Sequence, residues 1–183
     1  MNDRRLAEHV HIIGAGLLGT SIGLALAEKG AQATLADVSP TAVRLAVDYG
    51  AGRPLRADDR PGLIVVAVPP DVTAETVARA LGEHPDALVI DVASVKGSVL
   101  AELHSLGADV TRYLGTHPMA GRERGGPISA RADLFVGRPW VLAGHDQINY
   151  RRAGAIEDLI LDVGAVPIEM SVDEHDRSVA LIS

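Results

Sequence analysis

The segment from Val10 to Asp37 constrains the fold of this chain more than any other part of its sequence. It reads VHIIGAGLLGTSIGLALAEKGAQATLAD, a short apolar run followed by three spaced glycines, a segment of helical periodicity, another apolar run and an aspartate. This order predicts a strand at 9–13, a helix at 17–28 and a second strand ending at Asp37. A strand, a glycine-rich turn, a helix and a strand form the dinucleotide-binding unit of a Rossmann fold.

The three glycines have separate roles in this prediction. Gly14 permits the tight turn, Gly16 lets a pyrophosphate approach the backbone, and Gly19 lets the helix pack against the strand. The helix N-terminus adds N–H groups and the positive end of its dipole. Asp37 can accept hydrogen bonds from an adenosine ribose and would repel a 2′-phosphate, which favours NAD over NADP. The alternative is a turn without a ligand, in which Asp37 caps a helix.

The rest of the sequence continues the alternation of strands and helices. Further strands are predicted at 63–68, 87–91, 110–116, 140–143 and 165–169, and further helices at 41–49, 72–81, 95–106 and 147–163. We expect Ser39 and Asp71 to cap the first two of these helices, a loop at 121–130 and irregular structure at 51–61. The alternation predicts an α/β fold, with a doubly wound, mostly parallel sheet and right-handed crossovers.

The composition excludes several classes of protein and of site. The chain has 183 residues, enough for one domain with a sizeable core. It has no cysteine, which rules out disulfides, thiolate metal ligands and a cysteine nucleophile, and its seven histidines form no ligand cluster, so we predict no metal site. A net charge of −7 argues against nucleic acid as a partner. The sequence has neither a signal-like segment nor an apolar run that could span a membrane, so we expect a cytoplasmic protein.

The C-terminal segment predicts the start of another helix. Ser171 and Glu174 form a capping box, and apolar residues follow up to Ser183 without a helix-ending signal. We interpret residues 1–170 as the Rossmann domain and residues 171–183 as the first turns of a longer helix. The sequence is therefore expected to belong to a longer protein.

Candidate chemical groups follow two of the predicted strands. Ligands bind outside the carboxyl ends of the strands in an open parallel sheet. There the turn DVASVKG contributes Ser94 and Lys96, and the turn GTHPMAG contributes His117. The neutral imidazole of His117 could accept a proton from a substrate hydroxyl, with Ser94 orienting the imidazole or bonding the same hydroxyl. Lys96 could pair with a carboxylate. The alternatives are a structural histidine, a helix-capping Ser94 and a solvated Lys96.

The predicted cofactor site combines the glycine turn, the acid after the second strand and the end of the third strand. It comprises Gly14, Gly16, Leu17, Leu18, Gly19, Asp37, Val68 and Pro69.

The motifs GAGLLGTSIGLAL, DVASVKG, GTHPMAGRERGGP, DLFVGRPWVL and DEHDRSVALIS together resemble those of the prephenate dehydrogenase family, including its arogenate-using members. The resemblance covers nearly the whole chain and implies an NAD(P)-dependent oxidative decarboxylation of prephenate to 4-hydroxyphenylpyruvate, a step of tyrosine biosynthesis. It implies that His117, in the HP motif, accepts a hydrogen bond from the ring hydroxyl, and that Ser94, in SVKG, assists. It also implies a homodimer in the full-length protein, formed through a helical domain.

The chain departs from the family pattern in one loop and at its end. Arg122 and Arg124 could reach a substrate carboxylate, with a solvated loop as the alternative, and Glu123 is a further candidate for substrate contact. Gly125 follows Glu123 and Arg124, where family members usually carry a serine. The terminal segment matches the motif HDxxxAxxS with His175, Asp176 and Ser183, but the helical domain that follows this motif in family members is absent from the sequence. We therefore expect this chain to bind NAD with weak or no turnover.

Two other functions remain open on the sequence alone. A β-hydroxyacid dehydrogenase would share the Rossmann half, but residues 171–183 contain neither the lysine nor the asparagine of that family's pattern. A dinucleotide-binding regulatory or interaction module would need no complete substrate pocket. Continuation of the gene into a further helix with a second histidine motif would favour the enzyme over the module.

Overall fold

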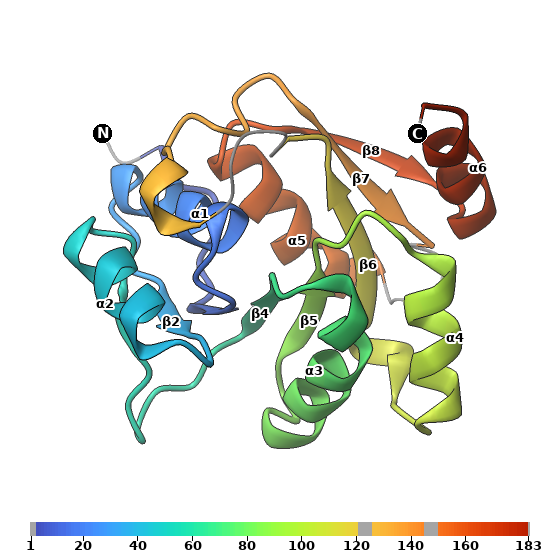
Figure 1. Ribbon diagram of the computed structural model, residues 1–183, viewed down its shortest axis with the longest axis horizontal. Helices are drawn as coiled ribbons and strands as arrows, with labels where there is room; N and C mark the ends of the chain where they lie inside the picture. The colour runs from blue at the N-terminus through green and yellow to red at the C-terminus, as the bar shows by residue number, and fades with distance from the viewer. Residues whose placement is uncertain (1–2, 121–125, 145–149, 183) are drawn as a thin grey trace.

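The computed structural model describes residues 3–120, 126–144 and 150–182, which fold around one eight-stranded sheet (Figure 1). Its strands are β1 (Val10–Ile13), β2 (Thr34–Ala36), β3 (Arg53–Pro54), β4 (Leu63–Val66), β5 (Leu88–Asp91), β6 (Tyr113–Pro118), β7 (Pro139–Ala143) and β8 (Val166–Met170). The helices are α1 (Leu17–Glu28), α2 (Pro40–Asp48), α3 (Pro70–Glu83), α4 (Gly97–Ser105), α5 (Tyr150–Asp162) and α6 (Val172–Ile182), with 3-10 turns at Val110–Arg112 and Pro127–Ser129.

The strand order creates a switch point in the middle of the sheet. The order is β3-β2-β1-β4-β5-β6-β7-β8, and each neighbouring pair is parallel except β6 and β7, which are antiparallel. From β1 the chain proceeds outward to β2 and β3, then crosses to β4 on the other side of β1. Connections that leave adjacent strands in opposite directions open a crevice at their carboxyl ends. The predicted mostly parallel, doubly wound sheet is confirmed.

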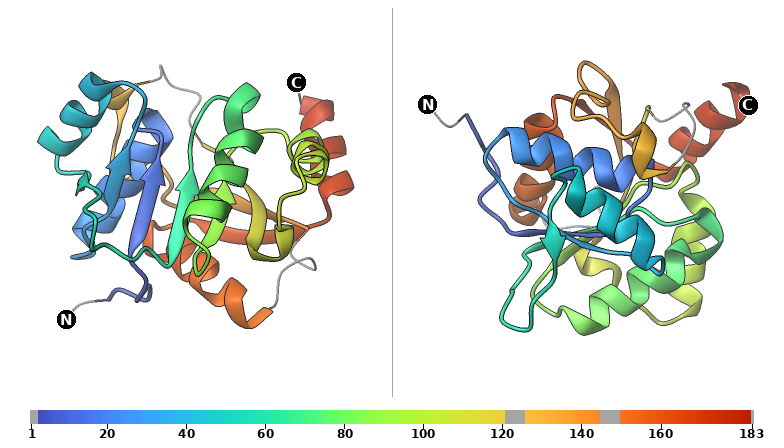
Figure 2. Two further views of the ribbon diagram at one scale, coloured as in Figure 1. Left: turned by 90° about the horizontal axis from the view of Figure 1, so that it is seen from below. Right: turned by 60° about the vertical axis from the view of Figure 1, so that its left-hand side comes forward.

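Each face of the sheet has its own hydrophobic layer. Leu63 and Val65 of β4 belong to the layer under α1, α2 and α5, whereas Ile64 and Val66 belong to the layer under α3 and α4. Successive side chains of a strand point to opposite faces, so a strand covered on both sides must be apolar throughout. This requirement explains the uninterrupted run in β4, and Figure 2 shows the helices on both faces of the sheet.

Most predicted boundaries agree with the structure to within a few residues, and α1 has the predicted bounds. The Oγ atom of Ser39 accepts a hydrogen bond from the N–H of Ala42 at 3.2 Å and caps α2, as predicted. The short strand β3 lies in the segment expected to be irregular, where it pairs with β2. It was missed because two residues carry no detectable periodicity.

The predicted cap of α3 is wrong. Pro69 occupies the N-cap position and Pro70 begins the helix, so Asp71 lies in the first turn instead. Proline is favoured at the first helical position because its φ is already helical and its missing N–H has no partner there. Asp71 still places a negative charge near the positive end of the helix dipole.

Helix α6 begins where the capping box predicts. The Oγ atom of Ser171 accepts a hydrogen bond from the N–H of Glu174 at 3.1 Å, and the N–H of Ser171 donates to Oε2 of Glu174 at 2.8 Å. The helix lies beside α4 and contacts β7 (Figure 2). It therefore brings residues from the end of the chain to the carboxyl end of the sheet.

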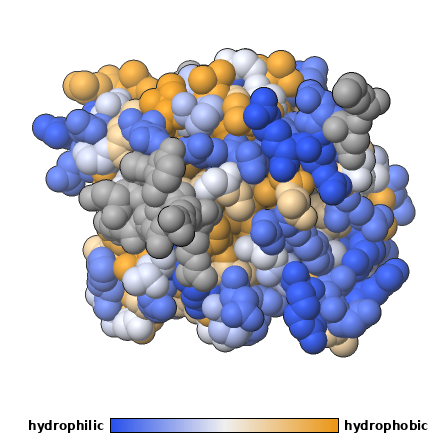
Figure 3. Space-filling view, turned by 180° about the vertical axis from the view of Figure 1, so that it is seen from behind, coloured by the Kyte–Doolittle hydropathy of each residue, from blue (hydrophilic) through white to orange (hydrophobic). Residues whose placement is uncertain are grey.

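The surface mixes polar and apolar regions. Seen from behind, apolar atoms gather along the upper margin of the molecule, and hydrophilic residues cover much of the lower right (Figure 3). Exposed apolar residues include Val136, Val166, Leu181 and Ile182. Among the helices of the described ranges, none is both long enough and apolar enough to cross a membrane.

Candidate active site

The glycine turn between β1 and α1 has the geometry that its spacing predicts. Gly14 has φ +113°, and a Cβ there would lie 2.1 Å from the carbonyl oxygen of Ala67. A Cβ on Gly19 would lie 1.8 Å from the carbonyl oxygen of Gly14. A Cβ on Gly16 would meet no atom within 4 Å. Two glycines therefore permit close packing within the protein, whereas Gly16 faces open space that a ligand can approach.

Asp37 is bound to the glycine turn itself. Its Oδ2 atom accepts a hydrogen bond from the N–H of Ala15 at 2.7 Å, and its Oδ1 atom accepts one from the N–H of Ser39 at 2.8 Å. These bonds join the end of β2 to the turn and to the start of α2. The carboxylate is only partly buried, and each oxygen can accept more than one hydrogen bond. Recognition of a ribose by Asp37 stays a prediction.

A cavity of about 430 Å³ lies at the carboxyl ends of β1, β4, β5 and β6. Its lining residues are Gly16, Leu17, Leu18, Ala67, Val68, Pro69, Pro70, Val92, Ala93, Ser94, His117, Pro118 and Ala120. Five residues of the predicted cofactor site thus share one cavity with both predicted catalytic residues. The N-terminus of α1 has no side-chain cap, because Gly16 occupies the N-cap position. The open helix N-terminus and the bare backbone of Gly16 suit a pyrophosphate, so the residues fit a dinucleotide.

His117 lies in a regular strand and not in the irregular turn that the sequence predicts. Strand β6 extends to Pro118 because it pairs with β7, with His117 opposite Val141. The Nδ1 atom of His117 lies 2.9 Å from Nε2 of His175. Burial, followed by the charges of His175 and Lys96, lowers the pKa of His117 to about 4. The imidazole is therefore neutral at pH 7, as a proton acceptor must be.

Ser94 is exposed and lines the same cavity as His117. The alternative that Ser94 caps the following helix is wrong, because α4 begins at Gly97 with Lys96 in the N-cap position. The hydrogen bond that orients the imidazole of His117 goes to His175. A contact between Ser94 and a substrate hydroxyl stays a prediction.

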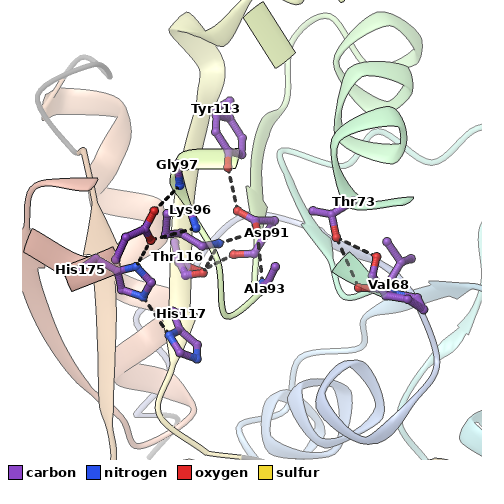
Figure 4. Close-up of polar contacts among 12 residues, drawn as sticks. Val68, Thr73, Asp91, Ala93, Lys96, Gly97, Tyr113, Thr116, His117 and His175 are labelled. Atoms are coloured by element: carbon purple, nitrogen blue, oxygen red, sulfur yellow. Dashed lines mark hydrogen bonds and ion pairs between the residues drawn. The ribbon is translucent and has the colours of Figure 1, made fainter. Parts of the chain in front are cut away.

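Lys96 does not reach the cavity, which corrects its assignment to the substrate. Its ammonium group donates to Oδ2 of Asp91 and, at 2.7 Å, to the carbonyl oxygen of Thr116 (Figure 4). Only 1% of its side chain is exposed, and burial lowers the pKa of Lys96 although Asp91 opposes this effect. Asp91 also accepts a hydrogen bond from the hydroxyl of Tyr113 at 2.8 Å. This buried pair fixes the DVASVKG turn against β6.

Two residues of α6 complete this part of the site. Asp176 lies 2.8 Å from His175 and accepts hydrogen bonds from the N–H groups of Lys96 and Gly97 at 3.2 and 2.8 Å. In the sequence, His175 and Asp176 fit the motif HDxxxAxxS, but the motif alone indicates no role for them. The remaining predicted substrate residues, Arg122, Glu123 and Arg124, lie outside the described residues.

Comparison with known proteins places this site in context. The family described as "prephenate dehydrogenase, nucleotide-binding domain" matches residues 22–169. A protein of Streptomyces niveus named as a probable prephenate dehydrogenase is 42% identical over 173 residues, which cover 93% of this chain and 47% of that protein. The crystal structure of Aquifex aeolicus prephenate dehydrogenase has a TM-score of 0.83 at 27% identity, covering 95% of this chain and 65% of that one.

A second structure of the Aquifex aeolicus enzyme, in complex with hydroxyphenyl propionate and NAD+, has a TM-score of 0.81 at 26% identity and covers 95% of this chain and 63% of that one. The present chain spans about half the length of the curated relatives it matches: 47% of the Streptomyces niveus protein and 51% of a prephenate dehydrogenase of Bacillus subtilis.

Proposed function

Because the chain belongs to the prephenate dehydrogenase family, we propose that residues 1–170 form its NAD-binding domain and that the cavity beside His117 holds the nicotinamide end of the cofactor. The observation that carries this proposal is the shared cavity: Gly16 lines the same space as Ser94 and His117. A dinucleotide whose pyrophosphate lies at the start of α1 would extend toward the carboxyl ends of β4, β5 and β6.

The proposed reaction is the oxidative decarboxylation of prephenate to 4-hydroxyphenylpyruvate. Bound NAD supplies the hydride acceptor. As hydride leaves the ring carbon that bears the hydroxyl, His117 accepts the hydroxyl proton at Nε2, and Ser94 bonds the same hydroxyl. The carboxylate then leaves as carbon dioxide, the electrons of the broken C–C bond enter the ring, and the proton returns from His117 to the oxygen. The cavity must therefore align the substrate and hold one proton.

The role of His117 is tested by His117→Asn in the complete gene product. The side-chain amide of asparagine can still reach His175, but it has no group in place of Nε2. We expect the turnover of prephenate to fall by about 10²–10⁴-fold, with the dissociation constant for NAD unchanged in a calorimetric titration. Retention of wild-type turnover would exclude His117 as the proton acceptor.

The substrate and the cofactor preference are tested by turnover of the complete gene product with prephenate and arogenate, each with NAD and NADP. We expect prephenate with NAD to react fastest. Faster turnover of arogenate would move the proposal to the arogenate-using members of the family. For the 183-residue chain alone we expect NAD binding with weak or no turnover, and efficient formation of 4-hydroxyphenylpyruvate by it would contradict that expectation.

A further inference from the structure

We propose that His175 and Asp176 are positioning residues that hold His117 in the tautomer with a free lone pair on Nε2. The inference rests on the proposed function, since it explains how His117 is prepared to accept a proton. It concerns α6, a helix that lies outside the predicted Rossmann domain. No part of the cofactor prediction involves this helix.

The three side chains form one continuous chain of hydrogen-bonded groups. Oδ1 of Asp176 lies 2.8 Å from Nδ1 of His175, and Nε2 of His175 lies 2.9 Å from Nδ1 of His117. The two rings meet edge to face, with centroids 5.1 Å apart and an interplanar angle of 77°. Figure 4 shows His175 reaching toward His117 from its own helix. With 1% of its surface exposed, His175 is held in this position by its surroundings.

The direction of each hydrogen bond follows from the charge of Asp176. Burial opposes the ionisation of this carboxyl, but hydrogen bonds from His175 and from the N–H groups of Gly97 and Lys96 outweigh it and hold the pKa of Asp176 below its ordinary value. An ionised carboxylate only accepts hydrogen bonds. Nδ1 of His175 must therefore carry a proton, and in the neutral form of this ring Nε2 is then the acceptor.

The same reasoning determines the state of His117. Because Nε2 of His175 accepts, Nδ1 of His117 must donate the hydrogen bond between them. In a neutral imidazole only one nitrogen carries a proton, so Nε2 of His117 has its lone pair free. Free imidazole side chains favour the opposite tautomer, so the lone pair would otherwise be on the wrong nitrogen. When Nε2 accepts a proton, the positive charge of His117 is stabilised through His175 by Asp176.

A purely structural role for these residues is the competing explanation. Asp176 also binds the first N–H groups of α4, so its removal would loosen the contact between α4 and α6. The matched control is Ser171→Ala, which weakens the N-cap of α6 and leaves every atom of the histidine pair in place. An effect that arises only from loosening α6 would appear in both variants.

The direct test is the tautomeric state of the two histidines, measured by two-bond ¹H–¹⁵N correlation spectra of the ¹⁵N-labelled chain at pH 7.5. We expect both His117 and His175 to carry the proton on Nδ1. In Asp176→Ala we expect His117 to shift to the Nε2-protonated form, and in Ser171→Ala we expect no change. A proton on Nε2 of His117 in the wild-type chain overturns the proposal whatever the variants do.

Turnover of the complete gene product gives a second readout. His175→Phe keeps a ring of similar size without an acceptor, and we expect kcat to fall about 10–100-fold with KM and NAD affinity little changed. His175→Gln places an amide oxygen near the position of Nε2, and we expect it to recover part of that loss. Equal kcat values for His175→Phe and wild type, or equal losses in the two variants, would overturn the proposal. If the wild-type protein does not oxidise prephenate, the proposed function fails while the tautomer measurement still decides this inference.

Discussion

Two regions of the site are built in different ways: the glycine turn (residues 14–19) and the His117 corner, which comprises Asp91, Ser94, Lys96, His117, His175 and Asp176. The glycine turn consists of backbone from consecutive residues, and Ala15 of this turn donates a hydrogen bond to the side chain of Asp37. The His117 corner consists of side chains from β6, from the turn that precedes α4, and from α6. His117 and His175 are 58 residues apart in the sequence. One region is therefore local in the sequence, and the other is assembled by the tertiary fold.

This difference determines how each region responds to mutation. The glycine turn depends on the absence of atoms, so a single added methyl group can break it. The His117 corner depends on the presence of paired polar groups, so it is sensitive to the loss of a partner. When one member of a buried polar network is removed, its partner stays buried without a hydrogen bond or counter-charge. The desolvation of that remaining group is then uncompensated, which lowers the stability of the fold. The following changes test this contrast.

The largest effect is expected from Gly14→Ala. The substitution adds a Cβ 2.1 Å from the carbonyl oxygen of Ala67, at a φ of +113° that alanine rarely adopts. We expect a loss of more than about 4 kcal/mol in the free energy of unfolding, measured by urea denaturation, or no folded protein. The matched control is Gly16→Ala, which we expect to fold within about 1 kcal/mol of wild type and to bind NAD at least about tenfold more weakly. Normal stability of Gly14→Ala would refute the backbone account.

In the His117 corner, Lys96→Met should destabilise the fold rather than weaken substrate binding. It leaves Asp91 buried without its cation, and removing one member of a buried ion pair typically costs about 3–5 kcal/mol. The free energy of unfolding is again the measurement. Lys29→Met is the control, because the pair of Lys29 with Asp3 is exposed at 3.5 Å and should change stability by less than about 1 kcal/mol. A stable Lys96→Met variant that only raises KM would restore the substrate assignment.

Buried histidines with a lowered pKa lie in the His117 corner and in β1, the strand that leads into the glycine turn, so acid should destabilise both regions. Burial, followed by the charges of His84 and His9, lowers the pKa of His11 in β1 to about 4. The unfolded chain takes up this proton near pH 6.5, so it binds more protons than the folded chain between pH 6.5 and 4. Stability should therefore fall across that window, by about 3 kcal/mol for His11 alone.

The measurement for His11 is the difference in unfolding free energy between wild type and His11→Asn at pH 7.5 and at pH 4.5. We expect the wild-type advantage to shrink as the pH falls, because asparagine can still reach Thr34 and does not titrate. His104→Asn, at an exposed position, is the control. A difference that does not depend on pH would show that His11 contributes no proton linkage.

The contrast between the two regions also explains which parts could be predicted from the sequence. The glycine spacing and the apolar run of β4 are local patterns. The glycine spacing predicts the turn between β1 and α1, and the apolar run predicts the strand β4. The order of the elements alone predicts that Ser94 and His117 share one cavity, because both lie at the carboxyl ends of neighbouring strands. The burial of Lys96 could not be predicted, because it requires knowing that Asp91 and the carbonyl group of Thr116 converge on one ammonium group.

The role of α6 was missed for a related reason. The capping box predicted where the helix begins, and the pair His175 and Asp176 was visible in the sequence. Their contact with His117 depends on the direction in which α6 crosses the carboxyl end of the sheet, and no local sequence pattern specifies that direction. The longer extent of β6 has a similar cause, since its last residues are ordered by antiparallel pairing with β7.

The smallest effect is expected for Asp37, whose side chain accepts a hydrogen bond from the glycine turn. This residue also gives the sharpest test of the contrast between the two regions. Asp37→Asn keeps one acceptor oxygen but places an amide group toward the N–H of Ala15 or Ser39, so we expect a loss of about 1 kcal/mol in unfolding free energy. If Asp37 also recognises a ribose, the preference for NAD over NADP should fall about tenfold in calorimetric titrations, because the variant no longer repels a 2′-phosphate. Ser39→Ala should cost a similar amount of stability through its cap on α2 and leave the NAD to NADP ratio unchanged. An unchanged ratio in Asp37→Asn would mean that this carboxylate serves only to hold the turn, so that the glycine turn binds its ligand through backbone alone.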